Sequence, residues 1–274
     1  MAKARHGWTT GAAIGRSLVA LCLLMTFVPD ARAEIETVQF PMTEFSGETT
    51  VLSAALARPA GEGPFPAVVL LNGCGGTYPT AAWAERFFGA LGYVALRIDS
   101  YGPRGIDGVC REHRAVASPA IRARDAHAGK TFLEGLDYVD PDAIAIIGWS
   151  HGGSAVLAAI ESIKSEQPDR QRPFAAAIAI YPGCAPSMLD LDSPLLIMIG
   201  DADVWTPAQR CIAMFMPRKL DHEYGLVVYP GASHGFDLEE LLDGPPIQGM
   251  TYDPVAADDA YARMSAFLEK YAGG

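Results

Sequence analysis

The hydrophobic positions of this chain fall into short apolar runs, separated by longer segments with the pattern of helices. The run Ala67–Leu71 contains no polar residue, as expected of a parallel strand covered on both faces. Similar runs recur along the chain. We expect strands at 49–57, 67–71, 93–98, 143–149, 174–181, 194–199 and 225–229. We expect helices at 80–91, 119–138, 154–163, 207–216 and 254–271.

This alternation of strands and helices predicts an α/β fold. Connections long enough for crossovers favour a doubly wound, mostly parallel sheet with helices on both faces. The first expected strand, 49–57, is assigned to an edge of the sheet. Residues 34–274 contain no internal repeat and no low-complexity linker, so they are predicted to form a single domain.

The first 33 residues have the pattern of an export signal. A basic start (Lys3, Arg5, Arg16) precedes an apolar run, 17–28, that is too short to span a bilayer comfortably. Small residues then lead to a predicted cleavage after Ala33. A retained membrane anchor is the alternative. We expect an exported protein, periplasmic or secreted.

The charge of the chain is acidic, with 21 Lys and Arg against 32 Asp and Glu, a net of −11. Residues 1–33 hold four of the basic groups and one acid, so the mature chain has 21 − 4 = 17 and 32 − 1 = 31, a net of −14. Such a surface repels phosphate backbones and anionic lipid. We therefore expect no nucleic-acid partner and, after leader removal, no membrane partner. The sequence predicts no oligomeric state.

Four cysteines follow the leader, namely Cys74, Cys110, Cys184 and Cys211. An even number in an oxidising compartment predicts two disulfides, with three possible connectivities. We favour Cys74–Cys110 and Cys184–Cys211, because each pair would tie neighbouring loops at the same edge of the sheet. Free buried thiols are the alternative. No zinc-binding spacing is present, and we expect neither a metal nor an organic cofactor.

The chemistry is organised around the stretch Gly148-Trp149-Ser150-His151-Gly152, which lies between an apolar run and a helical segment. Strand, Gly-x-Ser-x-Gly and helix in this order form a nucleophile elbow. Side chains at Gly148 and Gly152 would collide with neighbouring backbone, and the turn would strain Ser150 and expose its hydroxyl. Ser150 is the predicted nucleophile. The alternative is a glycine-rich turn before a buried helix.

Two further reactive residues follow strand ends, Asp203 and His234. The chain order Ser, Asp, His is that of an α/β-hydrolase. His234 would take the Ser150 proton and return it to the leaving alcohol, while Asp203 would orient the imidazole. Asp201 competes as the acid. We favour Asp203, because the acid must reach inward from the loop, which leaves Asp201 to cap that loop.

The oxyanion of a tetrahedral intermediate needs two donors. We expect the backbone N–H groups of His151, at a helix N-terminus, and of Cys74, in the glycine-rich loop 72–76. A tight strand-to-helix turn is the alternative for that loop.

Aromatic residues near predicted strand ends are candidate walls of a substrate pocket, with packing in the core as the alternative. They are Tyr78, Tyr101 and Trp205, together with the loop 242–252. Arg104 is a candidate partner for a substrate carboxylate, although a solvated or ion-paired loop arginine is the favoured interpretation. The acidic run 237–243 is interpreted as a solvated helix face.

Several of these stretches resemble the dienelactone hydrolase family of α/β-hydrolases. They are Asn-Gly-Cys-Gly-Gly at 72–76, Gly-Pro-Arg-Gly at 102–105, the elbow, Gly-Asp-Ala-Asp at 200–203 and, most specific, Tyr229–Asp237. The likeness extends from about residue 50 to 271 and implies an α/β-hydrolase fold with Ser150, Asp203 and His234 as its triad.

Members that hydrolyse dienelactone itself carry a cysteine nucleophile and a nearby glutamate. Here the nucleophile is serine, and loop 72–76 has no glutamate. We therefore expect a serine hydrolase that cleaves small-molecule esters, lactones being an open case, without any cofactor. A peptidase, an acyltransferase and a non-catalytic binding protein of this fold are the alternatives.

Overall fold

The computed structural model of the protein describes residues 34–76, 82–161, 172–185, 191–215 and 223–273. Arg32–Gly274 form one compact unit. The predicted leader, residues 1–33, lies outside the described residues, so its cleavage stays a prediction. Within the described ranges, no helix has the length and apolar character needed to cross a membrane.

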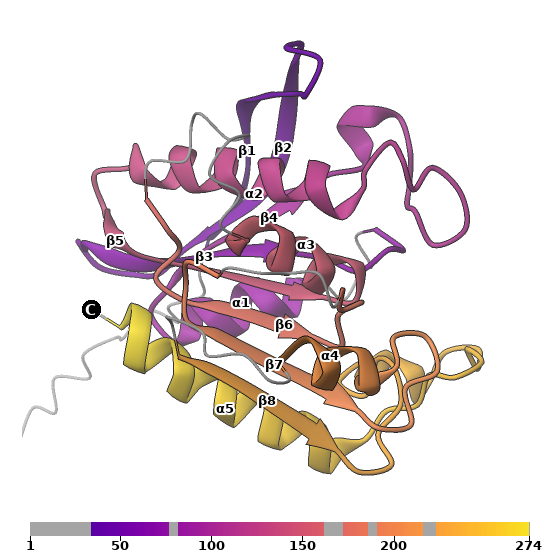
Figure 1. Cartoon of the computed structure of the whole chain (residues 1–274). Coiled ribbons are helices and arrows are strands. Elements are labelled where there is room, and N and C mark those ends of the chain that lie inside the picture. The colour runs from indigo at the N-terminus through magenta and orange to yellow at the C-terminus, as the bar shows by residue number, and fades with distance from the viewer. Residues whose placement is uncertain (1–33, 77–81, 162–171, 186–190, 216–222, 274) are drawn as a thin grey trace, which may run out of the picture. The chain divides into compact units, whose positions relative to one another are not determined.

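The described strands form one eight-stranded sheet in the order β1-β2-β4-β3-β5-β6-β7-β8 (Figure 1). Their bounds are β1 Glu34–Thr43, β2 Thr49–Arg58, β3 Phe65–Leu71, β4 Val94–Asp99, β5 Val139–Trp149, β6 Ala177–Ile180, β7 Leu195–Gly200 and β8 Tyr224–Tyr229. β1 and β2 are antiparallel, as are β2 and β4, and all the other neighbours are parallel.

Helices cover both faces of this sheet. They are α1 Ala82–Ala90, α2 Pro119–Glu134, α3 His151–Ile160, α4 Ala208–Phe215 and α5 Pro254–Ala272. α1 and α5 lie on one face, and α2, α3 and α4 on the other (Figure 1). Right-handed crossovers explain why α1 lies opposite α2, α3 and α4, because the chain moves one way along the sheet from β3 to β4 and the opposite way from β4 to β8. α5 follows the last strand and packs beside α1. The predicted doubly wound α/β architecture is confirmed.

The core is made by the parallel strands, whose side chains are covered on both faces. All five residues of Ala67–Leu71 in β3 have no solvent exposure. On the α1 face the indole of Trp83 meets the ring of Tyr261 from α5, with ring centroids 5.3 Å apart. Continuous apolar strands of this kind are what a sheet buried on both faces requires.

One prediction about the sheet is wrong. β2, expected at the edge, pairs on one side with β1 and on the other with β4. β1 takes the edge position, with Phe40 and Met42 buried against the core. Pro41 lies between them, and a residue without an N–H is tolerated on an edge strand. The apolar alternation of β1 covers only its second half, so the sequence pattern did not reveal it.

Both predicted disulfides are confirmed. Cys74 is bonded to Cys110, and Cys184 to Cys211. The first bond ties the loop after β3 to the loop after β4. The second ties the loop after β6 to α4. Both bonds therefore hold loops at the carboxyl ends of the parallel strands, where ligands of such sheets bind.

Removing the Cys184–Cys211 bond should destabilise the fold, because the unfolded chain then regains the freedom of a loop with a sequence separation of 27. We expect the double variant Cys184→Ala/Cys211→Ala to lose about 3 kcal/mol of unfolding free energy. Urea denaturation at pH 7 under non-reducing conditions measures this. A loss below about 1 kcal/mol would show that the bond restrains little of the unfolded chain.

Candidate active site

Ser150 occupies the sharp turn between β5 and α3, with φ 54° and ψ −117°. A Cβ added to Gly148 would lie 2.4 Å from the carbonyl of Gly152, and one added to Gly152 would lie 2.1 Å from the oxygen of Leu71. Both positions therefore exclude any side chain. The turn has the collisions and the strain predicted for a nucleophile elbow.

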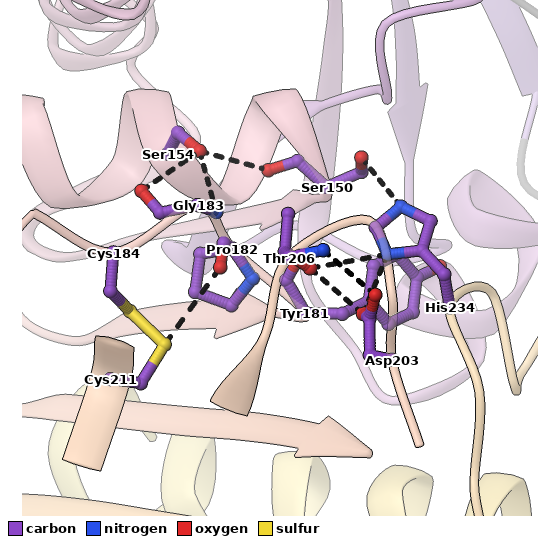
Figure 2. The surroundings of a disulfide bond; sticks show 10 residues. All are labelled: Ser150, Ser154, Tyr181, Pro182, Gly183, Cys184, Asp203, Thr206, Cys211 and His234. Atoms are coloured by element: carbon purple, nitrogen blue, oxygen red, sulfur yellow. Dashed lines mark hydrogen bonds and ion pairs between the residues drawn. A yellow bond between two sulfur atoms is a disulfide. The ribbon is translucent and has the colours of Figure 1, made fainter. Parts of the chain in front are cut away.

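The structure brings the three predicted catalytic side chains into one hydrogen-bonded row. His234 Nε2 lies 2.8 Å from Ser150 Oγ, and His234 Nδ1 lies 2.7 Å from Asp203 Oδ2. The three residues come from the elbow, the loop after β8 and the loop after β7 (Figure 2). His234 and Asp203 are buried, which shields their contact from competing water.

The surroundings of Asp203 keep its carboxylate charged. Oδ1 accepts hydrogen bonds from the N–H groups of Trp205 and Thr206, both at 2.8 Å, and the Thr206 hydroxyl donates to Oδ2 at 2.8 Å. Burial opposes ionisation, but the contacts with His234 and Thr206 outweigh it and hold the pKa of Asp203 below its usual value. Asp201 instead accepts the N–H of Gly231 at 2.6 Å, so it caps the neighbouring loop after β8 rather than its own.

The Cys184–Cys211 bond lies close to this row (Figure 2). Between the two, the N–H of Gly183 donates to Ser154 Oγ at 2.9 Å, and the Thr206 hydroxyl lies 3.0 Å from the carbonyl oxygen of Tyr181. The segment after β6 thus connects α3, which begins at the elbow, with the loop that carries Asp203.

The two predicted oxyanion donors belong to two segments that meet at the serine, the start of α3 and the loop after β3. His151 begins α3, so its N–H has no acceptor within the helix. The loop that holds Cys74 passes close by, since a Cβ built on Gly73 would be 3.7 Å from the Cβ of Ser150. The elbow and the loop of Cys74 are thus adjacent, as an oxyanion hole shared between them requires.

The loop that carries Cys74 is held from behind by the segment after β4. Besides the disulfide, Val109 N–H donates to the carbonyl of Cys74 at 2.7 Å, and the Tyr101 hydroxyl donates to the carbonyl of Gly73 at 3.1 Å. Tyr101 is 1% exposed and does not line the cavity beside Ser150. The expectation that Tyr101 walls the pocket is therefore corrected, because its ring supports the loop instead.

A buried arginine, which the sequence pattern did not reveal, joins the two sides of the site. Arg122 of α2 is fully buried and donates to the carbonyl of Asn72 at 2.8 Å and to its Oδ1 at 3.1 Å. Its Nη1 lies 3.0 Å from His151 Nδ1, which must be the acceptor because a guanidinium only donates. Arg122 thereby bridges the Cys74 loop and the elbow. Nothing in its helical sequence context distinguishes it from a solvated arginine.

A cavity of about 380 Å³ opens on Ser150 and His234. Its apolar walls include Trp83, Trp149, Trp205, Leu238, Ile247 and Met250. The indole of Trp205 stacks on the imidazole of His234, with centroids 5.2 Å apart. Trp205 and the loop 242–252 thus lie where a pocket wall was expected, whereas Tyr78 falls outside the described residues. In the described part of the chain, no group of three or more His, Cys, Asp or Glu side chains could hold a metal ion.

Arg104 does not reach this cavity, and the expectation that it meets a substrate carboxylate is corrected. Its guanidinium donates to both oxygens of Asp125, at 3.0 and 2.8 Å, and to Glu44 at 2.9 Å. The ion-paired loop arginine, which the sequence favoured, is the arrangement observed. Two acidic partners already occupy the donors that a substrate would need.

Asp237 is also corrected, because the acidic run 237–243 is not one solvated helix face. Its carboxylate is buried and accepts hydrogen bonds from Trp149 Nε1 at 2.9 Å and from the Tyr181 hydroxyl at 2.7 Å. Burial raises the pKa of Asp237. Only Glu239–Leu241 form a short 3₁₀ turn. Asp237 therefore fixes two aromatic rings that line the cavity. The sequence did not reveal this role, because Asp237 stands in a run of acidic residues that was interpreted as solvated.

The contact between His151 and Arg122 should make the free energy of unfolding depend on pH. Burial, and then the charges of Arg122 and Arg114, lower the pKa of His151 to about 4. In the unfolded chain an imidazole titrates near 6.5. At this histidine the unfolded state therefore binds more protons between these values, so the contribution of His151 to the free energy of unfolding falls as pH decreases from about 6.5 to about 4.

We expect His151→Gln, which keeps an acceptor for Arg122, to reduce this loss. Urea denaturation measures the free energy of unfolding between pH 7 and 4.5. This range lies above the pH at which Asp203 becomes protonated. His113→Gln, at a half-exposed histidine, is the matched control and should leave the slope unchanged. An identical pH slope in the wild type and His151→Gln would contradict the role assigned to this imidazole.

Comparisons with known proteins place these features in a family. The family model described as "Dienelactone hydrolase family" matches residues 52–272. A Bradyrhizobium protein named "Probable 2-oxo-3-(5-oxofuran-2-ylidene)propanoate lactonase" is 24% identical over 252 residues, which cover 85% of this chain and 95% of that protein.

Solved structures share the fold. A dienelactone hydrolase-like promiscuous phosphotriesterase, P91 from metagenomic libraries, is 20% identical with a TM-score of 0.68, over 86% of this chain and 98% of its own. An acylaminoacyl peptidase of Pyrococcus horikoshii is 16% identical with a TM-score of 0.66, but the match spans only 42% of that protein. With four-fifths of its length matched by the family model, the chain belongs to the dienelactone hydrolase family and is a carboxylic ester hydrolase.

Proposed function

We propose that the protein hydrolyses carboxylic esters by transferring the acyl group to Ser150. The observation that carries this proposal is the unbroken row from Ser150 Oγ through His234 to the Asp203 carboxylate, at 2.8 and 2.7 Å, at the mouth of a cavity. A serine hydroxyl is a weak nucleophile until a base within hydrogen-bond reach takes its proton. His234 meets that geometric requirement.

In the first half of the reaction, Ser150 Oγ attacks the ester carbonyl carbon while its proton passes to His234 Nε2. The imidazolium is stabilised by Asp203, and the oxyanion accepts hydrogen bonds from the N–H groups of His151 and Cys74. When the tetrahedral intermediate collapses, the bond to the leaving oxygen breaks and His234 returns the proton to the departing alcohol. An acyl-enzyme remains on Ser150.

In the second half, water attacks the acyl carbon and gives its proton to His234. The same donors hold the second oxyanion, and the proton returns to Ser150 Oγ as the carboxylic acid leaves. A lactone follows the same steps, except that its alcohol stays attached to the acyl group. The lactonase name of the Bradyrhizobium relative supports ring esters as a second substrate class.

We also propose that the protein works outside the cytoplasm, beginning at Glu34. Two disulfides support this location, because thiols are kept reduced in the cytosol. The leader-like residues 1–33 support it independently.

A fluorophosphonate probe tests the nucleophile directly. We expect the chain from Glu34 onward to take one adduct, mapped by mass spectrometry to Ser150 and absent in Ser150→Ala. His234→Ala should slow 4-nitrophenyl acetate hydrolysis by about a thousandfold or more, because the serine loses its base. Ser265→Ala is the matched serine control, since this hydroxyl donates to the carbonyl of Tyr261 far along α5.

A correctly folded protein without any adduct would contradict the proposal and favour a binding protein of this fold. The peptidase alternative, which the acylaminoacyl peptidase fold match keeps open, is tested with the anilide of the same acyl group. An anilide cleaved with a kcat/KM within about tenfold of its ester would favour a peptidase, since a tenfold ratio is only about 1.4 kcal/mol of transition-state discrimination.

A further inference from the structure

The charged side chains that line the cavity bear on whether its substrate can carry a charge. Among the described lining residues, Arg97 and Glu240 are the charged side chains besides the proposed base His234. Arg97 extends from β4, and its Nε donates to the carboxylate of Glu85 at 2.6 Å. Glu85, on α1, is fully buried. The positive charge in the cavity is therefore already matched by a buried negative one.

Besides Arg97, the described arginines Arg104, Arg114 and Arg122, near this end of the sheet, do not line the cavity. Arg114 is exposed and donates to the carbonyl oxygen of Cys110 at 2.9 Å. Arg104 is bound to Asp125 and Glu44, and the guanidinium of Arg122 lies behind the loop, on Asn72 and His151. A substrate carboxylate in the cavity would meet Glu240, and the described side chains that line the cavity offer no surplus positive charge to offset its lost hydration. The acidic chain as a whole, with a net charge of −11, adds a further repulsion.

The walls of the cavity favour an uncharged, apolar ligand. Three indoles, of Trp83, Trp149 and Trp205, face the same space as Leu238, Ile247 and Met250. A volume of about 380 Å³ admits a small organic group of several carbons beside the serine. Burial of such a group is favourable in proportion to its apolar area.

We propose that this cavity selects esters whose enclosed portion is uncharged and apolar, and rejects esters that carry a carboxylate there. The inference rests on the proposed ester hydrolysis and names its substrate class. It sets the chain apart from the Bradyrhizobium relative, whose name specifies a carboxylate-bearing lactone.

Three 4-nitrophenyl esters with the same leaving group test the inference: the hexanoate, the 6-oxoheptanoate and the hydrogen adipate. The last two have nearly the same shape and differ in a terminal acetyl group or carboxylate. We expect hexanoate and 6-oxoheptanoate to be hydrolysed with kcat/KM values within about tenfold of each other, and the hydrogen adipate at least about a hundredfold more slowly, because its charge is desolvated without a partner.

A pair of variants separates a local effect from the overall charge. Glu240→Gln removes the carboxylate that lines the cavity, and should raise kcat/KM for the hydrogen adipate about three- to tenfold relative to the 6-oxoheptanoate. Glu239→Gln removes the same charge from the preceding residue, which is exposed and does not line the cavity. It should leave the ratio unchanged.

Equal or faster hydrolysis of the hydrogen adipate would overturn the inference and indicate that Arg97 receives the substrate carboxylate, while ester hydrolysis itself would stand. Equal ratios in the two glutamate variants would also overturn the local role of Glu240. If none of the three esters is cleaved and no fluorophosphonate adduct forms, the proposed function fails, and this inference fails with it.

Discussion

The close approach of α3 to the ends of β3 and β5 is the constraint on which the rest of the site depends. It exists because Gly148 and Gly152 have no side chains, which lets the backbone of the helix start contact the backbone that follows Leu71. One contact then has three consequences. The Ser150 hydroxyl is raised above the sheet, the N–H of His151 points outward from a helix start, and the loop that carries Cys74 lies beside the serine.

Buried polar side chains stabilise the elbow and the loop of Cys74. Arg122 bridges the Cys74 loop and the elbow, while Asp237 receives hydrogen bonds from Trp149 and Tyr181. A polar group in the core is costly unless its partners are present, so each of these contacts allows few alternative arrangements. The two disulfides act on the same loops through covalent bonds. The site is thus supported by its surroundings more than by its own three side chains.

The sequence predicted those parts of the structure that depend on local pattern or chain order. Continuous apolar runs indicated the parallel strands, and the position of reactive residues at strand ends brought Ser150, Asp203 and His234 together. It did not predict β1, whose alternation is incomplete, or the pairing of Arg104 with Asp125. It also missed the burial of Arg122 and Asp237. A charged residue is ordinarily expected to be solvated, and only the packing of distant elements reveals that it is enclosed.

The central claim is that hydrolysis passes through an acyl-enzyme, and product partitioning tests it most directly. In this experiment the protein is given 4-nitrophenyl hexanoate or phenyl hexanoate, each with the same concentration of methanol. A shared intermediate on Ser150 has lost its leaving group before methanol or water attacks. The account therefore predicts the same ratio of methyl hexanoate to hexanoic acid from both esters. A ratio that changes with the leaving group would contradict a common acyl-enzyme and indicate direct attack on the bound ester.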